Sequence, residues 1–165
     1  MIHGFPSVVS VSATRLVLGS MPGERSLHEN RYYAHPQNAF WRIIFALFDS
    51  VGNDKYQIEN NYVHGLQLLQ SADIGLWDVL QTCAREGSLD ADIIETSVIA
   101  NDFSKLLAEY PTIKKIYFNG AKAEHLYKRH VLPALNDQEK NLTMIKLPST
   151  SPAYAAMSFE KKLQL

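Results

Sequence analysis

The chain has 165 residues, a length that fits one domain folded around one core. Hydrophobic residues make up 46% and charged residues 20% of the sequence, which excludes a disordered tail and a repeat array. The formal net charge of −1 excludes a globally basic nucleic-acid binder, although it does not exclude a local basic face.

The single cysteine, Cys83, excludes an internal disulfide and indicates a reduced, cytoplasmic or nuclear setting. Met1 to Ser12 lack the pattern of a secretory signal, and no apolar run reaches the length of a membrane span. We therefore expect a soluble, cytoplasmic, monomeric protein that forms a single domain over residues 1–165 and has no membrane partner.

Charge is distributed unevenly along the chain. Lys and Arg outnumber Asp and Glu by 1 in residues 1–50 and by 5 in residues 110–165, whereas Asp and Glu lead by 7 in residues 51–109. Solvated surface is the ordinary explanation of such segments. The alternative is that the basic third faces a polyanion while the acidic middle faces away, except at Asp78.

Apolar periodicity predicts the elements in chain order. Residues 14–18 form a short apolar run, typical of a buried strand, that ends at Gly19 and leads into a loop and then a polar stretch. From Asn38 the spacing predicts a helix with one buried face, and Asn38 is its N-cap or a first-turn residue. The residues expected to face inward are Phe40, Trp41, Ile44, Phe45, Leu47 and Phe48.

The rest of the chain continues the same alternation of apolar strands and amphipathic helices. The predicted order is helix 60–70 with Leu66, Leu68 and Leu69 inward, strand 74–80, polar segment 85–94, helix 102–110, strand 115–119, helix 121–131, strand 142–147 and a final helix over about 158–165.

This βα alternation predicts an α/β fold with three α/β/α layers and a central, mainly parallel, four-stranded sheet. In such sheets the ligand binds at the carboxyl ends of the strands. The functional site is therefore expected in the loops after Leu18, around Asp78, at Asn119 and after Leu147.

Common catalytic motifs are missing from the sequence. It contains no G-x-G-x-x-G, no phosphate-binding loop with Lys-Ser/Thr, and no G-x-S-x-G. His125 and His130 are five residues apart and have no cysteine pair nearby, so we interpret them as surface histidines. Cys83 is interpreted as structural rather than nucleophilic. We therefore expect no metal and no cofactor.

Two loops after predicted strands have unusual compositions. The first, Gly19-Ser-Met-Pro-Gly23, combines two glycines with a proline, and this forces a tight path that can aim N–H groups at an acceptor. It is followed by a segment in which Asn38 offers a carboxamide at the start of a helix. The second loop is Leu147-Pro-Ser-Thr-Ser-Pro-Ala153. The alternative for the first loop is an ordinary turn followed by a helix cap.

These loops carry a resemblance to a known family. Gly19-Ser-Met-Pro-Gly23 with Tyr33-Ala-His-Pro-Gln-Asn-Ala-Phe-Trp41 resembles the first motif block of the uracil-DNA glycosylase superfamily, in its mismatch-specific branch, and Leu147-Pro-Ser-Thr-Ser-Pro152 resembles the second. The Ser-Met form is most similar to the hypoxanthine-DNA (DNA-deoxyinosine) glycosylases. The matching order extends through Gly75-Leu-Trp-Asp78, Arg85-Glu-Gly-Ser-Leu-Asp90 and Ile116-Tyr-Phe-Asn-Gly120.

The resemblance implies a uracil-DNA glycosylase-like fold and a monofunctional DNA glycosylase of base-excision repair, cytoplasmic and associated with the nucleoid by function. Its partner is DNA, double-stranded and carrying a deaminated base. Met21 stands where the mismatch-specific branch has a water-positioning Asn, and Leu147 stands where the most active uracil enzymes have His. The implied substrate is therefore chiefly hypoxanthine, flipped out of the duplex, and the implied catalytic carboxamide is Asn38.

Asn38 is expected to orient water beneath C1′ of the sugar. His35 either adds a hydrogen bond or touches a phosphate, or it is a buried, capping histidine. In the base pocket we expect backbone N–H groups from Gly19, Ser20 and Met21. An aromatic ring, Tyr33 or Phe40, stacks on the base or belongs to the core. Asp78 either accepts a hydrogen bond from N1–H of hypoxanthine or is an ordinary capping residue.

The second loop is expected to contact DNA. Ser149, Thr150 and Ser151 suit phosphate contacts, and Pro152-Ala-Tyr154 suits a wedge in the base stack. Nearby lysines, Lys146, Lys161 and Lys162, are expected to neutralise backbone charge. The alternatives are a non-catalytic damaged-DNA binding module, a mismatch-specific uracil or thymine glycosylase, and a small hydrolase using Ser149 and His35.

Overall fold

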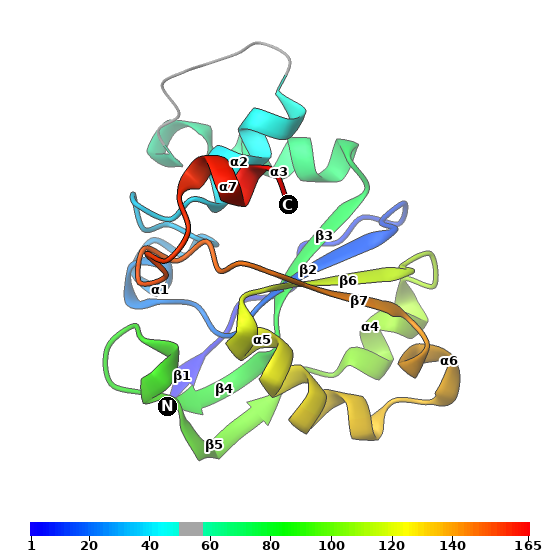
Figure 1. Cartoon of the computed structure of the whole chain (residues 1–165). Coiled ribbons are helices and arrows are strands. Elements are labelled where there is room, and N and C mark those ends of the chain that lie inside the picture. The colour runs from blue at the N-terminus through cyan, green and yellow to red at the C-terminus, as the bar shows by residue number, and fades with distance from the viewer. Residues whose placement is uncertain (50–57) are drawn as a thin grey trace.

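The computed structural model describes residues 1–49 and 58–165. Its central sheet has four parallel strands in the order β3-β2-β6-β7 (Figure 1). The strands are β2 (Arg15–Gly19), β3 (Ile74–Asp78), β6 (Lys115–Asn119) and β7 (Thr143–Leu147). The prediction of a four-stranded parallel sheet is confirmed. Gly19 pairs with Asp78, and Asn119 pairs with Leu147, so the strand ends meet at one edge.

Helices cover both faces of this sheet (Figure 1). One face carries α2 (Phe40–Phe48), α3 (Ile58–Ser71) and α7 (Phe159–Leu163). The other carries α4 (Phe103–Glu109), α5 (Ala121–Leu126) with its π-helical continuation η2 (Tyr127–Val131), the 3-10 turn η3 (Leu132–Ala134) and α6 (Asp137–Lys140). The three-layer architecture is as predicted, and the helices expected from periodicity are all present.

A second sheet escapes the sequence prediction. It is antiparallel, in the order β1-β4-β5, and consists of β1 (Ile2–His3), β4 (Leu80–Ala84) and β5 (Ile94–Ala100). The expected strand 74–80 therefore covers all of β3, the break at Val79 and the first residue of β4. Val79 separates the two because its N–H donates to the Gly19 carbonyl and its carbonyl accepts from Asn101. The segment expected to be polar contains η1 (Asp90–Asp92) and the first residue of β5.

Two local predictions about helices are wrong. The polar stretch before Gln37 contains α1 (Glu24–Glu29), a short helix in which only Ser26 is buried, so it has no apolar face to reveal it. In α2, Leu47 and Phe48 are 54% and 37% exposed rather than inward, because the last turn extends beyond the packed cluster around Trp41.

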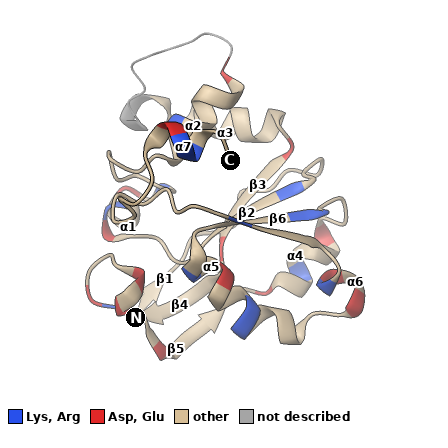
Figure 2. Ribbon diagram, viewed as in Figure 1, with Lys and Arg blue, Asp and Glu red and all other residues tan. Residues whose placement is uncertain are grey.

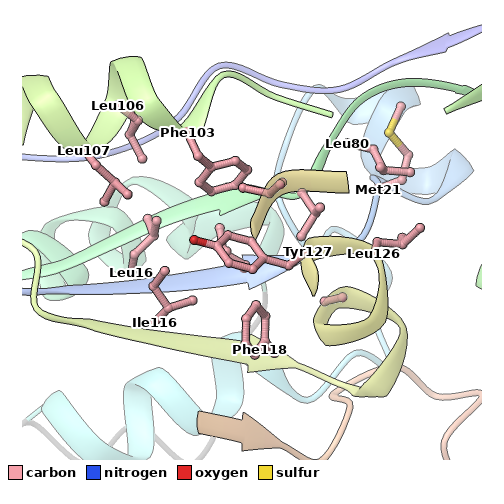
Figure 3. Close-up of a cluster of buried hydrophobic side chains, with 14 of the residues drawn as sticks. Leu16, Met21, Leu80, Phe103, Leu106, Leu107, Ile116, Phe118, Leu126 and Tyr127 are labelled. Atoms are coloured by element: carbon pink, nitrogen blue, oxygen red, sulfur yellow. The ribbon is translucent and has the colours of Figure 1, made fainter. Parts of the chain in front are cut away.

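Two buried clusters hold the strands in place. In the cluster beneath α4 and α5, the ring of Tyr127 lies between Phe103 and Phe118, with ring centroids 5.1 and 5.2 Å away (Figure 3). In the second cluster, the Trp41 indole N–H donates to the Tyr32 carbonyl at 2.8 Å. This bond ties the segment before α2 to the core. Among the described residues, no helix is both long and apolar enough to cross a bilayer.

Candidate active site

A cavity of about 560 Å³ lies at the carboxyl ends of the parallel strands, as expected from the fold. Its walls come from the loop after β2, the segment before α2, the end of β3, the turn around η1, the start of α5 and the loop after β7. In Figure 1 these loops gather on the left, around α1. The predicted residues that line it are Gly19, Ser20, Met21, Tyr33, His35, Asn38, Asp78, Ser149, Thr150, Ser151 and Pro152.

Gly19, Tyr33 and Asp78 form the floor of the cavity. A Cβ atom on Gly19 would overlap the Asp78 carboxyl and lie 2.9 Å from the Tyr33 hydroxyl, so this position needs glycine for the close approach. Tyr33 adopts a left-handed backbone with φ of 52°. Its ring stacks on Phe40 with centroids 4.2 Å apart. Phe40 is buried behind it and does not line the cavity, so of the two candidate rings only Tyr33 can reach a bound base.

Two polar atoms on this floor have no hydrogen-bond partner among the described residues: the Tyr33 hydroxyl and Oδ2 of Asp78. Asp78 is only 3% exposed. Buried polar groups are nearly always paired, so an unpaired carboxyl beside an unpaired phenol is typical of a ligand-binding site. An ordinary capping role for Asp78 would have left its carboxyl hydrogen-bonded to backbone N–H groups.

The charges around Asp78 come from the neighbouring loop. Burial, followed by the nearby Asp90 carboxylate, raises the pKa of Asp78 to about 7, and the Arg85 guanidinium opposes this rise. Burial also raises the pKa of Tyr33, and Asp78 raises it further. Near neutral pH the Asp78 carboxyl is therefore divided between its neutral and its ionised form, while Tyr33 keeps its proton.

Arg85 and Asp90 were not predicted as site residues, although both belong to the Arg85-to-Asp90 segment that matched the family pattern. The buried Arg85 side chain donates to the carbonyls of Gly87 at 2.9 Å and Pro22 at 2.7 Å. Asp90 accepts a 2.6 Å hydrogen bond from the Ser20 hydroxyl. These bonds fasten the segment to the loop after β2, and they fix the charges that act on Asp78.

The backbone of the loop after β2 is oriented by β3 and β4. The carbonyls of Gly19 and Ser20 accept from the N–H groups of Val79 and Leu80, at 2.9 and 3.1 Å. Because the C=O and N–H of a trans peptide point in opposite directions, the N–H groups of Ser20 and Met21 point away from those strands. The loop can thus present donors to a group bound in the cavity.

Asn38 stands at the rim, one residue before Ala39, the N-cap of α2. Its expected place as N-cap is therefore wrong by one residue, yet its Oδ1 accepts from the Phe40 N–H at 2.9 Å and so still caps the helix. The Asn38 N–H donates to the His35 carbonyl at 2.9 Å. The carboxamide is thus fixed by its oxygen at a position that lines the cavity.

His35 is exposed, so the expectation of a buried histidine is wrong. Its capping role is nevertheless present, because Nδ1 accepts a 3.2 Å hydrogen bond from the Gln37 N–H. His35 therefore shapes the turn that presents Asn38.

Thr150 connects the second loop to the rest of the site. Its N–H donates to Oδ1 of Asn119 and its Oγ1 accepts from Nδ2 of Asn119, both at 2.8 Å, and its carbonyl accepts from the Ala39 N–H at 3.0 Å. Thr150 is buried. The expected phosphate contact of its hydroxyl is corrected accordingly: Thr150 joins β6, β7 and the start of α2. Asn119, the last residue of β6, lies at one of the four strand ends where the sequence predicted the site, although the role of its side chain was not predicted.

The rest of this loop faces outward. The Ser149 hydroxyl accepts from the Ser151 N–H at 3.2 Å, and both residues are half-buried. Pro152 and Tyr154 are exposed at the mouth of the cavity. Lys162 holds Tyr154 in place, since its Nζ donates to the Tyr154 carbonyl at 3.1 Å and lies 5.2 Å from the ring centroid. This arrangement leaves an aromatic side chain available at the rim.

Lys146 does not line the cavity; it is exposed on β7, with Nζ 3.9 Å from Glu124. Cys83 is buried on β4, away from the cavity, in keeping with a structural role. His125 lies at the surface, with Nε2 3.4 Å from Glu95. Within residues 1–49 and 58–165, no three His, Cys, Asp or Glu side chains are grouped as ligands for a metal ion.

The expected separation of acidic and basic thirds is wrong. Asp90, from the acidic middle, lines the cavity, and Glu95 lies 3.4 Å from Lys122, which belongs to the basic third and also lines it. Figure 2 shows Lys and Arg spread over α5, α6, α7 and the starts of β2 and β6 rather than gathered on one side. Segments that are distant in sequence pair in space, which a count along the chain does not reveal.

The chain is similar to known proteins over most of its length. Residues 6–164 match the model of the Uracil DNA glycosylase superfamily. Relatives named hypoxanthine DNA glycosylase, from Methanosarcina barkeri and Methanosarcina acetivorans, are 39% identical over 121 residues and 37% over 122, covering 73% of this chain and 72% of each relative. The solution structure of a candidate uracil DNA glycosylase from Methanosarcina acetivorans aligns with a TM-score of 0.75 and 33% identity, over 98% of this chain and 92% of that one.

Proposed function

The chain belongs to the uracil DNA glycosylase superfamily and is a DNA glycosylase of base-excision repair, and from this premise we propose that the base it removes is chiefly hypoxanthine. Two relatives carry that substrate in their names. The observation that carries the proposal is the unpaired, buried carboxyl of Asp78 on the floor of a cavity whose rim holds the Asn38 carboxamide.

The reaction is hydrolysis of the N-glycosidic bond. Its transition state places positive charge on the sugar and negative charge on the departing base, so a catalyst works by stabilising those charges and by positioning water. The amide of Asn38 orients the water beneath C1′. The N–H groups of Ser20 and Met21 interact with the negative charge that develops on the base.

Asp78 reads the edge of the base. Hypoxanthine differs from adenine in having a 6-oxo group and a proton on N1, and an acceptor oxygen of Asp78 receives a hydrogen bond from that N1–H. The unprotonated N1 of adenine meets the same oxygen unfavourably. Tyr33 supplies the stacking surface, with Phe40 supporting its ring from behind.

DNA binds with the damaged nucleotide extruded into the cavity, because a base inside the duplex cannot reach Asp78. Ser149, Ser151 and Lys146 contact the DNA backbone, and the segment from Pro152 to Tyr154 wedges into the gap in the base stack. The protein acts as a monomer on double-stranded DNA in the cytoplasm. A bifunctional mechanism would need a lysine amine as nucleophile. Lys122 lines the cavity, but its ammonium lies 3.4 Å from Glu95 and is held there by the carboxylate, so the mechanism is monofunctional.

The test is single-turnover excision from a duplex with one deoxyinosine, developed with alkali to reveal abasic sites. Asn38→Ala is expected to slow excision by about 100-fold or more, since positioned catalytic groups contribute on that order. Gln37→Ala, an exposed neighbour, serves as the matched control and retains the rate. Excision by Asn38→Ala at the wild-type rate would remove the assignment, and duplex binding without scission would identify a binding module.

Substrate rank is tested by placing uracil, xanthine, mismatched thymine or adenine at the same position of the same duplex. Hypoxanthine is expected to be released fastest. Faster release of uracil or thymine would instead assign the protein to the mismatch-specific activity.

A further inference from the structure

Resting on the proposed function, we propose that Asp78 acts on hypoxanthine as a neutral carboxylic acid, which accepts from N1–H with its carbonyl oxygen and donates its own O–H to the 6-oxo oxygen of the departing base. Asp78 is then a catalytic residue as well as a reader of the base. The ligand class it selects is a lactam edge, an N–H beside a C=O.

Among the described residues, no protein group is hydrogen-bonded to the Asp78 oxygen that would carry the proton. Oδ2 of Asp78 is buried and has no hydrogen-bond partner among the described residues, and the Tyr33 hydroxyl beside it is equally unpaired. A carboxylate in this position would need donors to compensate its burial. A neutral acid with one donor and one acceptor needs only one complementary edge, and a lactam supplies it through two parallel hydrogen bonds.

The second support is the set of charges that face Asp78. Asp90 raises its pKa and Arg85 lowers it, and burial gives the largest contribution, so the carboxyl keeps its proton up to about pH 7. The neighbouring phenols, Tyr32 and Tyr33, remain neutral because burial and Asp78 raise the pKa of both. Ser20 holds Asp90 in position by a 2.6 Å hydrogen bond, so the negative charge near Asp78 is fixed rather than mobile.

The chemistry balances without a cofactor. The C1′–N9 bond breaks and its electron pair enters the purine, where the charge is shared with the 6-oxo oxygen; the O–H of Asp78 stabilises that charge without leaving Asp78. Water bonds to C1′ and loses a proton to solvent, and the released base takes up a proton from solvent. A carboxylic acid kept neutral to donate a hydrogen bond to a developing oxyanion is an established way of stabilising such charge.

The decisive variant is Asp78→Asn, because a carboxamide mimics the neutral acid: it has one acceptor and one donor in nearly the same shape, and it does not titrate. With protein kept below saturation, so that the rate reports the free protein, single-turnover excision of hypoxanthine by wild type is expected to fall about tenfold per pH unit above a midpoint near 7. Asp78→Asn is expected to stay within about tenfold of wild type at pH 6 and to show no such fall. At pH 9 the variant is then faster than wild type.

Asp90→Asn tests the source of the midpoint. It keeps an acceptor for the Ser20 hydroxyl and removes the charge that raises the Asp78 pKa, so the midpoint is expected to move to lower pH. Asp102→Asn, which retains the N-cap of α4 outside the cavity, is the matched control and keeps the wild-type midpoint. His35→Gln also keeps the midpoint, which separates Asp78 from the imidazole at the rim.

A wild-type rate that is flat or rises between pH 6 and 9 would overturn the inference, as would a folded Asp78→Asn protein that loses excision more than 1000-fold. Either result leaves the glycosylase itself intact. Failure of the proposed function is recognised differently, by wild-type protein that releases no hypoxanthine at any pH.

Discussion

Polar groups at the rim of the cavity are hydrogen-bonded to one another, whereas those on its floor are not. At the rim, Asn119 and Thr150 satisfy each other, and the Thr150 carbonyl also caps Ala39. On the floor, the Asp78 carboxyl and the Tyr33 hydroxyl are buried with atoms left unpaired. The hydrogen-bonded network positions the loops. The unpaired groups lower the stability of the fold, but they are able to form hydrogen bonds with a ligand. Active sites commonly trade stability for function in this way.

Asp78→Asn should give the largest change in stability, by removing the titratable group from the floor. Its folded pKa lies near 7, above the ordinary value of 3.8, so the folded state holds the proton more tightly than the unfolded state. Stability therefore falls as pH rises from about 4 to 7 and remains low above that range. At pH 8 the variant is expected to be more stable by up to about 4 kcal/mol, at 1.36 kcal/mol per pKa unit.

Urea unfolding of both proteins between pH 4 and 8 measures this difference. The two curves should approach each other towards pH 4 and meet below the ordinary pKa of 3.8, where the carboxyl is protonated in both states. Parallel curves across the whole range would show that Asp78 titrates as an ordinary surface carboxyl.

Gly19→Ala should have the next largest effect, because its added methyl group occupies the floor of the cavity. Its added methyl would overlap the Asp78 carboxyl and approach the Tyr33 hydroxyl, so the base would lose its deepest position. We expect excision to fall about 100-fold and stability to fall by about 1–3 kcal/mol, as for other overpacked sites. Single-turnover rates and urea midpoints provide the readouts.

Gly23→Ala is the matched stability control, because its methyl would lie 3.6 Å from the Ser88 hydroxyl, in ordinary contact. If Gly19→Ala unfolds no more easily than Gly23→Ala and excises hypoxanthine at the wild-type rate, the floor is not where the base binds.

Thr150→Val should disrupt the hydrogen-bond network at the rim of the cavity. It removes the acceptor for Nδ2 of Asn119 and leaves a half-buried amide unpaired, which costs about 1–3 kcal/mol. The excision rate should fall as well, because the loop and Ala39 are joined through Thr150. Thr143→Val, at an exposed position on β7, is the control and should change stability by less than about 0.5 kcal/mol. Equal stability of the two variants would show that the network contributes nothing.

The same contrast explains what the sequence could reveal. Buried parallel strands are apolar along their whole length, so the strands at residues 14–18 and 115–119 could be predicted from the sequence. Their carboxyl ends then predict the edge of the sheet where the cavity lies. The antiparallel sheet was not, because β5 alternates half-buried and exposed positions without a strong apolar face. Motif residues such as Asn38 and Asp78 were found in the sequence. Arg85 and Asp90 act through bonds to Pro22 and Ser20, which only the folded chain brings together.

The smallest effect is expected outside the cavity, at the exposed ring of Tyr154. This side chain is 40% exposed, and Lys162 holds it at the mouth of the cavity, so we expect its ring to stack where the flipped nucleotide leaves the duplex. Tyr154→Ala should weaken binding to a deoxyinosine duplex by about 1 kcal/mol, at the low end for a base–aromatic stack. Tyr154→Phe keeps the ring and should bind as wild type does. Fluorescence anisotropy with Asn38→Ala as the background measures binding without turnover, and equal affinities for the alanine and phenylalanine variants would exclude the ring from the interface.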